Sequence, residues 1–232
     1  TSILFDFILA LPVLVFSLVA HEYAHGLAAL RQGDDTALRQ GRLTLNPIPH
    51  IDPWFTLIMP ALLWFATKGA FTFGGAKPVE VRPENYRHYR RGDIIVSMAG
   101  VATNLLLSLV SAALFVLLGL LARAGADLAG ILGTAQRMLT WGVWLNLMLA
   151  CFNALPIPPL DGSHVLYHLL PPAMRGRYRS FQRLGFLVLL GVMLLAPGAI
   201  RWLLTPALVG MRWFVRWAGP FAASAQWNIF PS

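Results

Sequence analysis

Long apolar runs alternate with short polar segments along this chain. Residues 3–20 are almost entirely apolar and the helical pattern continues to Leu30, which predicts one membrane-spanning helix over residues 3–30. Its 28 residues would extend about 42 Å, which is enough to cross a bilayer with a turn or two to spare. Three later runs are also long enough to span: Ile94–Leu121, Ile131–Leu155 and Phe181–Leu204.

The segments between these runs predict shorter elements. Residues 54–67 are apolar but number only 14, too few to cross a bilayer comfortably. Arg39–Leu45 alternates loosely and predicts a short strand, whereas Phe71–Val81 predicts an extended segment broken by glycine and proline. Near the C-terminus, arginines and tryptophans within residues 207–226 favour an interfacial amphipathic helix, although a sixth span stays open.

The expected fold is therefore an all-α polytopic membrane protein with about five to six transmembrane helices. Short β or extended and re-entrant elements are expected between the first and second full spans. The sequence shows no internal repeat and no linker. We therefore expect a single membrane-embedded domain over residues 1–232, with its core at 3–170 and C-terminal helices at 180–228.

Composition narrows the class of protein further. Apolar residues make up 57% of the chain and charged residues 12%, whereas a soluble domain has about 25% charged residues. The net charge of +8 comes from basic residues between the apolar runs, which favours contact with a lipid bilayer over a nucleic-acid partner. The single cysteine, Cys151, excludes a disulfide framework and a cysteine-based zinc site, so any metal must be held by histidines and carboxylates.

The first predicted span contains the pattern His21-Glu22-Tyr23-Ala24-His25. On a helix, residues four apart share a face, so the two imidazoles of such a pattern can bind one zinc ion. Glu22 lies next to the first ligand and can take a proton from metal-bound water. Three ionisable residues within a run that could cross a bilayer are energetically costly, which itself indicates function.

A catalytic zinc ion needs a third protein ligand. The candidates are His50, His164, His168 and the carboxylates other than Glu22. Asp161 is favoured because it follows a proline-rich break at the end of the third span, and an opened helix is tolerated in a membrane where it lines a watery cavity. An ordinary turn at Asp161-Gly162 is the alternative.

Together these motifs resemble the site-2 protease family of intramembrane zinc metalloproteases. The resemblance covers residues 10–170 and rests on HEYAH at 21–25 and NALPIPPLDG at 153–162, with support from GRLTLNPIPHIDP (41–53), FGGAKPVEV (73–81) and RRGDIIVSMAGVATN (90–104). It implies that His21, His25 and Asp161 bind one zinc ion per chain and that Glu22 is the catalytic base. It also implies that Asn153 positions a transmembrane protein or peptide substrate.

One departure from the family pattern is visible. Where many members have Gly-Pro, this chain has Gly100-Val101, which we expect to alter local helix geometry and not the chemistry. The chain resembles compact prokaryotic members without a PDZ or CBS module.

Four other polar residues also have expected roles. Asn104 is a second candidate for positioning substrate, although a hydrogen bond to another helix explains it equally well. His50 is expected to order its own loop. His164 and His168 lie four residues apart and are expected to form an exposed polar helix face, with an accessory metal site as the less favoured interpretation.

A shared zinc ion constrains the topology. If His21, His25 and Asp161 meet, residues 31–93 must begin and end on one side of the membrane, so 54–67 should be re-entrant or lie on the surface. That side carries thirteen Lys and Arg residues in 31–52, 68–93 and 175–183, against Arg123 and Arg137 opposite. The positive-inside rule then predicts that the active site faces the cytoplasm, and the resemblance to compact prokaryotic members implies a multi-pass protein of the prokaryotic cytoplasmic membrane.

The leading hypothesis is an intramembrane zinc endopeptidase in which Glu22 activates zinc-bound water. Extended segments at Arg39–Leu45 and Phe71–Val81 could hold an unwound substrate by strand addition, or pair only with each other. The alternative function is a membrane metal-ion carrier or sensor that uses the same His and Asp ligands without hydrolysis. A transporter of that kind should show repeated halves, and it would have no use for Glu22 beside a ligand.

Overall fold

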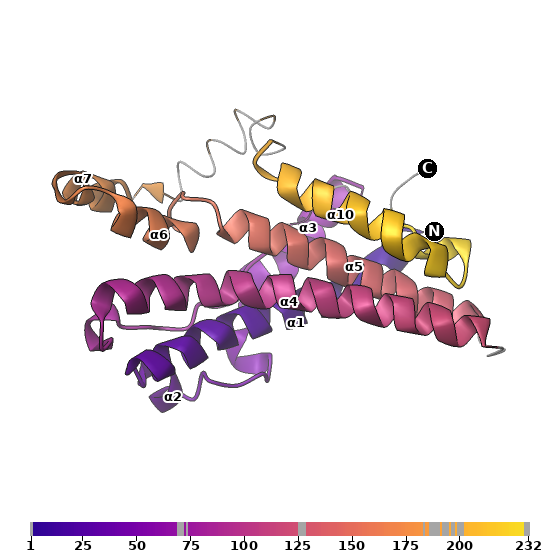
Figure 1. The fold of residues 1–232 in the computed structure, drawn as a ribbon, viewed down its shortest axis with the longest axis horizontal. Coiled ribbons are helices and arrows are strands. Elements are labelled where there is room, and N and C mark those ends of the chain that lie inside the picture. Colours follow the sequence, from indigo (N-terminus) through magenta and orange to yellow (C-terminus); the bar gives the residue numbers. More distant parts are fainter. Residues whose placement is uncertain are drawn as a thin grey trace.

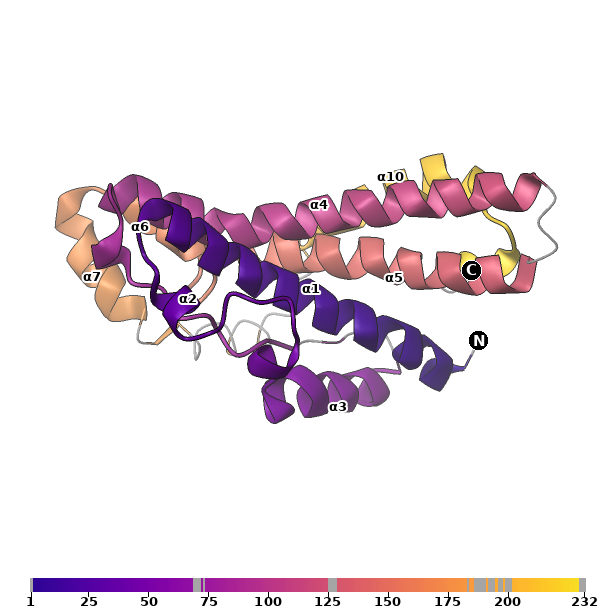
Figure 2. The same ribbon diagram turned by 90° about the horizontal axis from the view of Figure 1, so that it is seen from below.

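Three long helices form the body of the molecule. The computed structural model describes residues 2–68, 72, 74–124, 129–182, 184–185, 191, 195, 198 and 202–229. Within them, α1 (Ile3–Gln32), α4 (Tyr89–Arg123) and α5 (Ala129–Asn153) pack against one another, and α10 (Thr205–Ala218) lies along α4 and α5 (Figures 1 and 2). The predicted runs 3–30, 94–121 and 131–155 are therefore present as helices.

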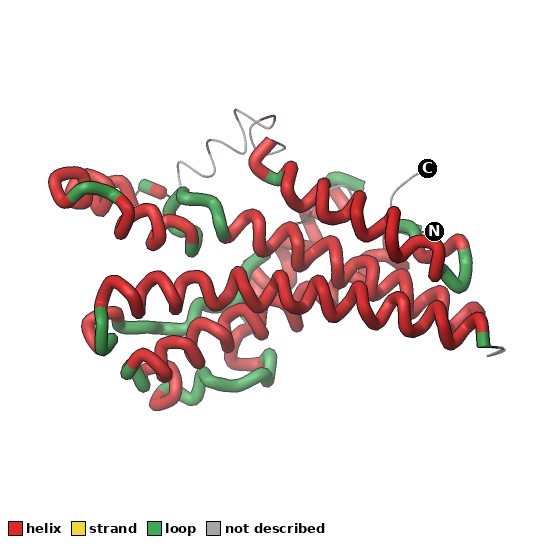
Figure 3. Tube along the Cα trace, in the orientation of Figure 1, coloured by secondary structure: helices red, strands yellow, loops and turns green. Residues whose placement is uncertain are grey.

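Shorter helices gather mainly at one end of this bundle. No strand occurs in the part of the chain that the structure describes (Figure 3). The short α-helices are α2 (Thr36–Arg39), α3 (Met59–Ala66), α6 (Gly162–Leu169) and α7 (Pro172–Gln182). A π-helical segment, Pro53–Ile58, leads into α3, and single 3₁₀ turns lie at Ile48–His50, Pro83–Asn85, Gly219–Phe221 and Ala225–Trp227.

Two helices of the described chain, α1 and α4, are long and apolar enough to cross a membrane. The five to six spans expected from sequence are therefore not confirmed. Helix α5 covers most of the predicted run 131–155 but buries polar side chains, including Gln136 and Asn146. The predicted span Phe181–Leu204 lies largely outside the described residues. Helix α10 has 14 residues, fewer than the roughly 20 that a span needs.

The connection that follows α1 returns to the same end of the bundle. Gly33 ends α1 with a φ of 113°, a conformation that glycine adopts without steric cost. The Arg87 N–H then donates to the carbonyl of Gln32 at 2.8 Å. Asp34 is fully buried and accepts hydrogen bonds from Thr36 and from the Arg82 backbone at 2.7 Å. The start of α4 therefore lies beside the end of α1.

The predicted strand over Arg39–Leu45 is wrong. Arg39 is the last residue of α2, and the chain turns directly afterwards through Gly41, whose φ is 66°. The Arg42 N–H donates back to the carbonyl of Ala37 at 2.9 Å. A left-handed glycine and a closed turn interrupt the extended backbone that alternation alone suggested.

Residues 53–68 run along α1, and residues 74–78 lie back beside the start of that segment. Trp64 of α3 donates from its indole nitrogen to the carbonyl of Ile3 at 3.0 Å, close to the start of α1. On return, Gly75 donates to the Phe55 carbonyl at 3.0 Å and Lys77 to the His50 carbonyl at 2.8 Å. The predicted extended segment Phe71–Val81 is described except at residues 71 and 73. Its residues 74–81, here called the return limb, form neither helix nor strand.

The position of Arg137 differs from the one assumed when basic residues were counted on the two sides of the membrane. It lies within α5, buried, and not in the connection between α4 and α5. Its guanidinium group donates to both carboxylate oxygens of Asp6 on α1, at 2.6 and 2.9 Å. Arg137 is therefore a packing residue between helices, and Arg123 alone remains of the two basic residues assigned to the opposite side.

Candidate metal centre

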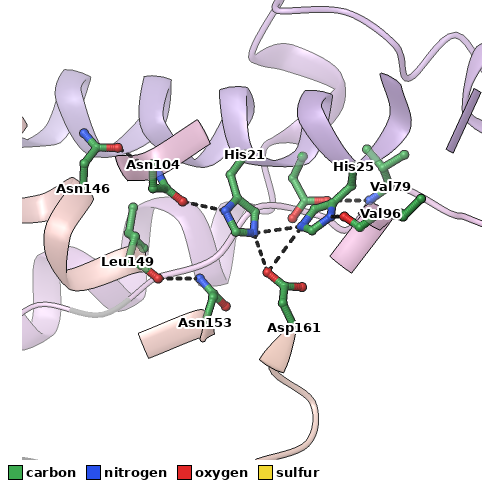
Figure 4. Close-up of polar contacts among 10 residues, drawn as sticks. His21, His25, Val79, Val96, Asn104, Asn146, Leu149, Asn153 and Asp161 are labelled. Atoms are coloured by element: carbon green, nitrogen blue, oxygen red, sulfur yellow. Dashed lines mark hydrogen bonds and ion pairs between the residues drawn. The ribbon is translucent and has the colours of Figure 1, made fainter. Parts of the chain in front are cut away.

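Three side chains from distant parts of the chain converge beside α4. His21 and His25 lie one helical turn apart on α1, and their Nε2 atoms are 3.0 Å apart. The Oδ2 atom of Asp161 lies 3.2 Å from Nε2 of His21 and 3.5 Å from Nε2 of His25 (Figure 4). Among the described residues, these three side chains form a group close enough together to hold a metal ion.

Helix α4 orients both imidazole rings. The Nδ1–H of His21 donates to Oδ1 of Asn104 at 2.6 Å, and the Nδ1–H of His25 donates to the carbonyl of Val96 at 2.7 Å (Figure 4). An amide oxygen and a carbonyl can only accept hydrogen bonds, so each ring carries its proton on Nδ1. The Nε2 lone pairs are then free and face each other and Asp161.

Asn104 belongs to a buried hydrogen-bond network. It is fully buried and donates from Nδ2 to Oδ1 of Asn146 at 2.8 Å. Asn146 donates in turn to Oγ of Ser17 at 2.9 Å. Both ends of the Asn104 amide are therefore used within the protein, which is the hydrogen-bonding interpretation left open by the sequence. The second interpretation, contact with substrate, finds no support in this geometry.

Gly100 allows the α4 backbone to approach the two rings. A Cβ atom at this position would lie 2.5 Å from Cε1 of His21 and 2.5 Å from Nε2 of His25. Any side chain would therefore occupy the space at which the ligand atoms converge. The departure from the family pattern, Val101, is buried and removes none of these contacts.

The donor set fits a zinc ion. Oδ2 of Asp161 is buried and has no hydrogen-bond donor, and two imidazole lone pairs point at it. Without a cation three electron-rich atoms would face one another, whereas tetrahedral zinc with bonds of about 2.0–2.1 Å separates its ligand atoms by about 3.3 Å. The observed separations of 3.0, 3.2 and 3.5 Å bracket that value.

A break between α5 and α6 positions Asp161. Prolines at 156, 158 and 159 interrupt the helix after Asn153, and Leu160 closes a turn onto the carbonyl of Ile157 at 2.9 Å. Asp161 then directly precedes α6, and its carbonyl accepts from the His164 N–H at 3.1 Å. A Cβ atom on Gly162 would lie 2.1 Å from the Ala154 carbonyl oxygen, so glycine permits this tight return.

Glu22 and an apolar cavity lie beside the three ligands. Oε2 of Glu22 accepts a hydrogen bond from the Val79 N–H of the return limb at 2.7 Å. The cavity has a volume of about 190 Å³, and Glu22, His21 and Asn153 contribute to its lining. Asn153 also donates from Nδ2 to the carbonyl of Leu149 at 3.0 Å (Figure 4). The other residues that line the cavity are mostly aliphatic residues and glycines.

Asp93 is a polar residue that the sequence analysis missed. It is buried on α4, where His168 donates to it at 2.7 Å and His164 at 3.2 Å. The hydrogen bond to Asp93 raises the pKa of His164 while burial opposes the increase. The expected exposed polar face is therefore wrong for His168, which is 2% exposed. His50, by contrast, orders its own loop by donating to the Thr44 carbonyl at 3.0 Å.

A pattern along α4 could have revealed Asp93. The buried positions Asp93, Val96, Gly100 and Asn104 are spaced by three or four residues and share one face. Small and polar residues at that spacing within an apolar helix indicate a face that packs against other helices. Considered by itself, Asn104 does not indicate that Asp93 lies on the same buried face.

Comparison with known proteins identifies the family. The model of peptidase family M50 matches residues 7–196. "Putative zinc metalloprotease YwhC" of Bacillus subtilis is 35% identical over 186 residues, which cover 78% of this chain and 79% of that protein. "Putative zinc metalloprotease Rip2" of Mycolicibacterium smegmatis is 32% identical over 200 residues, covering 84% of this chain and 70% of that protein. No solved structure matches. The chain belongs to peptidase family M50, the site-2 protease family that its motifs resemble.

Proposed function

We propose that this protein is an intramembrane zinc endopeptidase that cleaves a peptide bond within or near a transmembrane segment of its substrate. The observation that carries the proposal is the convergence of His21, His25 and Asp161 beside Glu22 and an apolar cavity. Zinc metalloprotease activity agrees with the family and with the names of the relatives. The intramembrane substrate rests on the apolar helix α1 that carries the motif.

Each residue of the centre has a distinct role in this proposal. His21, His25 and Asp161 hold the zinc ion. When bound, zinc acts as a Lewis acid toward the scissile carbonyl and lowers the pKa of water. Glu22 accepts the proton of the attacking water and later donates it to the leaving amine. The Val79 N–H holds the Glu22 carboxylate at 2.7 Å, beside the ligands and on the wall of the cavity.

The cavity gives the substrate site its chemistry. Its lining is dominated by aliphatic side chains of α1 and α5 and includes Thr72 and residues 74–76 of the return limb. Such a wall suits an apolar peptide side chain. A transmembrane helix hides its carbonyls in internal hydrogen bonds, so the substrate must unwind locally before it reaches Glu22. Asn153 is proposed to hold the unwound backbone.

The return limb limits where strand addition can occur. The N–H groups of Gly75, Lys77 and Val79 donate within the protein, and Pro78 has none. The carbonyls of Lys77 and Pro78 accept hydrogen bonds from Arg42 at 2.7 and 3.3 Å. Substrate contact through the backbone is therefore proposed for Thr72, Gly74 and Ala76, which line the cavity, and not for the whole predicted segment.

We further propose a multi-pass protein with its metal centre toward the cytoplasm. The hydrogen bond between Arg87 and Gln32 supports a connection that leaves and re-enters one side. The path of residues 53–68 along α1, where Trp64 contacts the carbonyl of Ile3, supports a re-entrant element. Basic residues concentrate in the connections at this end, as the positive-inside rule requires of the cytoplasmic side.

A single substitution tests catalysis separately from metal binding. Glu22→Gln keeps the size of the side chain and an oxygen for the Val79 N–H, but it cannot take the proton. Zinc should remain near one per chain by elemental analysis. Cleavage of a model transmembrane peptide should fall by a factor on the order of 10² or more. The matched control is Glu80→Gln, an exposed carboxylate on the same limb, which should change neither quantity.

The alternative function gives a different pattern. In a metal carrier or sensor, His21→Ala, His25→Ala and Asp161→Ala would abolish metal binding, whereas Glu22→Gln would have no functional consequence. Substantial proteolysis by the Glu22→Gln protein would refute the assigned mechanism. Full zinc retention after Asp161→Ala would remove Asp161 from the centre.

A further inference from the structure

A second cluster of ionisable side chains joins α4 to α6. Asp93 on α4 is 5% exposed and accepts hydrogen bonds from Nε2 of His168 at 2.7 Å and from Nδ1 of His164 at 3.2 Å. The His168 ring is enclosed between Tyr89 and Tyr167, with ring centroids 5.4 and 5.0 Å away. The proposed chemistry gives this cluster no role, although Asp93 lies within the segment RRGDIIVSMAGVATN (90–104).

The geometry of the cluster favours a clamp over a second metal site. Two ring nitrogens already donate directly to one carboxylate, which satisfies both partners without an ion. Among the described residues, His21, His25 and Asp161 place three ligand atoms within 4.8 Å of one another. The atoms of Asp93, His164 and His168 are not that close together. A buried carboxylate shared by two imidazoles instead fixes the helix that carries them against the helix that carries the carboxylate.

The position of α6 gives this clamp a consequence. Helix α6 begins at Gly162, directly after Asp161, so its orientation sets where the Asp161 carboxylate lies. Oδ2 of Asp161 has no hydrogen-bond donor of its own, and the chain before it is a proline-rich break. The backbone on one side of this ligand is therefore irregular, and the other side is α6, held by Asp93.

We propose that Asp93 is a positioning residue for the metal ligand Asp161, acting through His164 and His168 to fix α6 against α4. Helix α4 would then orient all three ligands from one face: Asn104 orients His21, Val96 orients His25, and Asp93 places Asp161. The inference rests on the proposed metal centre and adds a residue to it. Groups outside the ligand shell commonly change metal affinity 10- to 100-fold when they are removed.

The test measures metal geometry directly, using Co²⁺ as the probe in the purified chain of residues 1–232. The visible absorption bands of bound Co²⁺ report the coordination geometry, and a titration gives the affinity. Asp93→Asn removes the charge and places an amide N–H against a donor. We expect altered Co²⁺ bands and an affinity about 10- to 100-fold weaker.

Paired variants separate the hydrogen bonds from general packing. Gln can place an amide nitrogen where Nε2 of His168 lies, and Asn can do so for Nδ1 of His164. We therefore expect His168→Gln and His164→Asn to retain most of the wild-type spectrum, whereas His168→Leu and His164→Ala should shift it. The matched control is Asp34→Asn, another buried carboxylate, whose hydrogen-bond donors Thr36, Arg82 and Asn85 lie outside α6. It should lower stability without changing the Co²⁺ bands of the folded fraction.

The outcomes are distinct. Wild-type bands and affinity in Asp93→Asn and His168→Leu would overturn the proposal, as would an equal change in Asp34→Asn. If Asp93→Asn does not fold, the His168 and His164 pairs decide the question by themselves. Absence of Co²⁺ binding by the wild-type chain would instead refute the metal centre, and the positioning role of Asp93 with it.

Discussion

Substituting Gly100 by alanine adds one methyl group at the metal centre. Its Cβ would lie 2.5 Å from ring atoms of both His21 and His25, about 1 Å inside ordinary van der Waals contact. The rings cannot retreat freely, because Asn104 and Val96 of the same helix hold them at 2.6 and 2.7 Å. Overpacking of this kind typically costs about 1–3 kcal/mol, so zinc affinity should fall about 5- to 140-fold.

The intrinsic effect on α4 has the opposite sign. Alanine is about 1 kcal/mol more favourable than glycine within a helix, so Gly100→Ala need not weaken the fold of the metal-free chain. Zinc affinity is measured by competition with a chelating dye in detergent. The matched control is Gly130→Ala, since a Cβ at that helical position meets nothing within 4 Å. If Gly100→Ala binds zinc as tightly as Gly130→Ala, the two rings do not lie where we place them.

Three further predictions concern the surroundings of the centre. Asn104→Ala leaves one imidazole N–H without its acceptor and should weaken zinc binding about 10- to 100-fold in the same dye assay. Asp6→Ala leaves Arg137 buried without its charged partner; denaturant unfolding should show a loss of about 3–5 kcal/mol with unchanged zinc content. Single cysteines at Arg39 and His88, both exposed, should label from the same side of the membrane in a background without the native cysteine; labelling from opposite sides would refute the returning connection.

The long helices were predictable because each carries a continuous apolar run. The expected span over residues 3–30 corresponds to α1, Ile3–Gln32. The expected run 94–121 corresponds to α4, which begins five residues earlier, at Tyr89. That first turn is polar, so hydrophobicity marks the apolar length of the helix and misses its start. The prediction of a short strand was wrong for a related reason, because the alternation of apolar and polar residues over 39–45 carries no information about the left-handed turn at Gly41.

The candidate site was predictable where its geometry is local. His21 and His25 meet because they lie one turn apart on a single helix. Asp161 could be named only from a helix break and a family resemblance, since no local rule brings residue 161 to residue 21. The role of the Val96 carbonyl could not be predicted from the sequence, because every residue has a backbone carbonyl. Asp93 needed its partners His164 and His168, whose contact with α4 depends on how the chain folds back after residue 155.

Two parts of the chain position the side chains of the candidate centre. Side chains and one carbonyl of α4 orient the histidine ligands, whereas a backbone N–H of the return limb holds Glu22. Metal binding therefore depends on the identity of a few α4 residues, because their side chains supply the acceptors. The position of Glu22, the proposed base, depends on the path of the limb and tolerates changes of side chain there, because Val79 contributes its backbone. Since residues 74–76 of that limb also line the cavity, the segment proposed to meet the substrate is continuous with the one that holds Glu22.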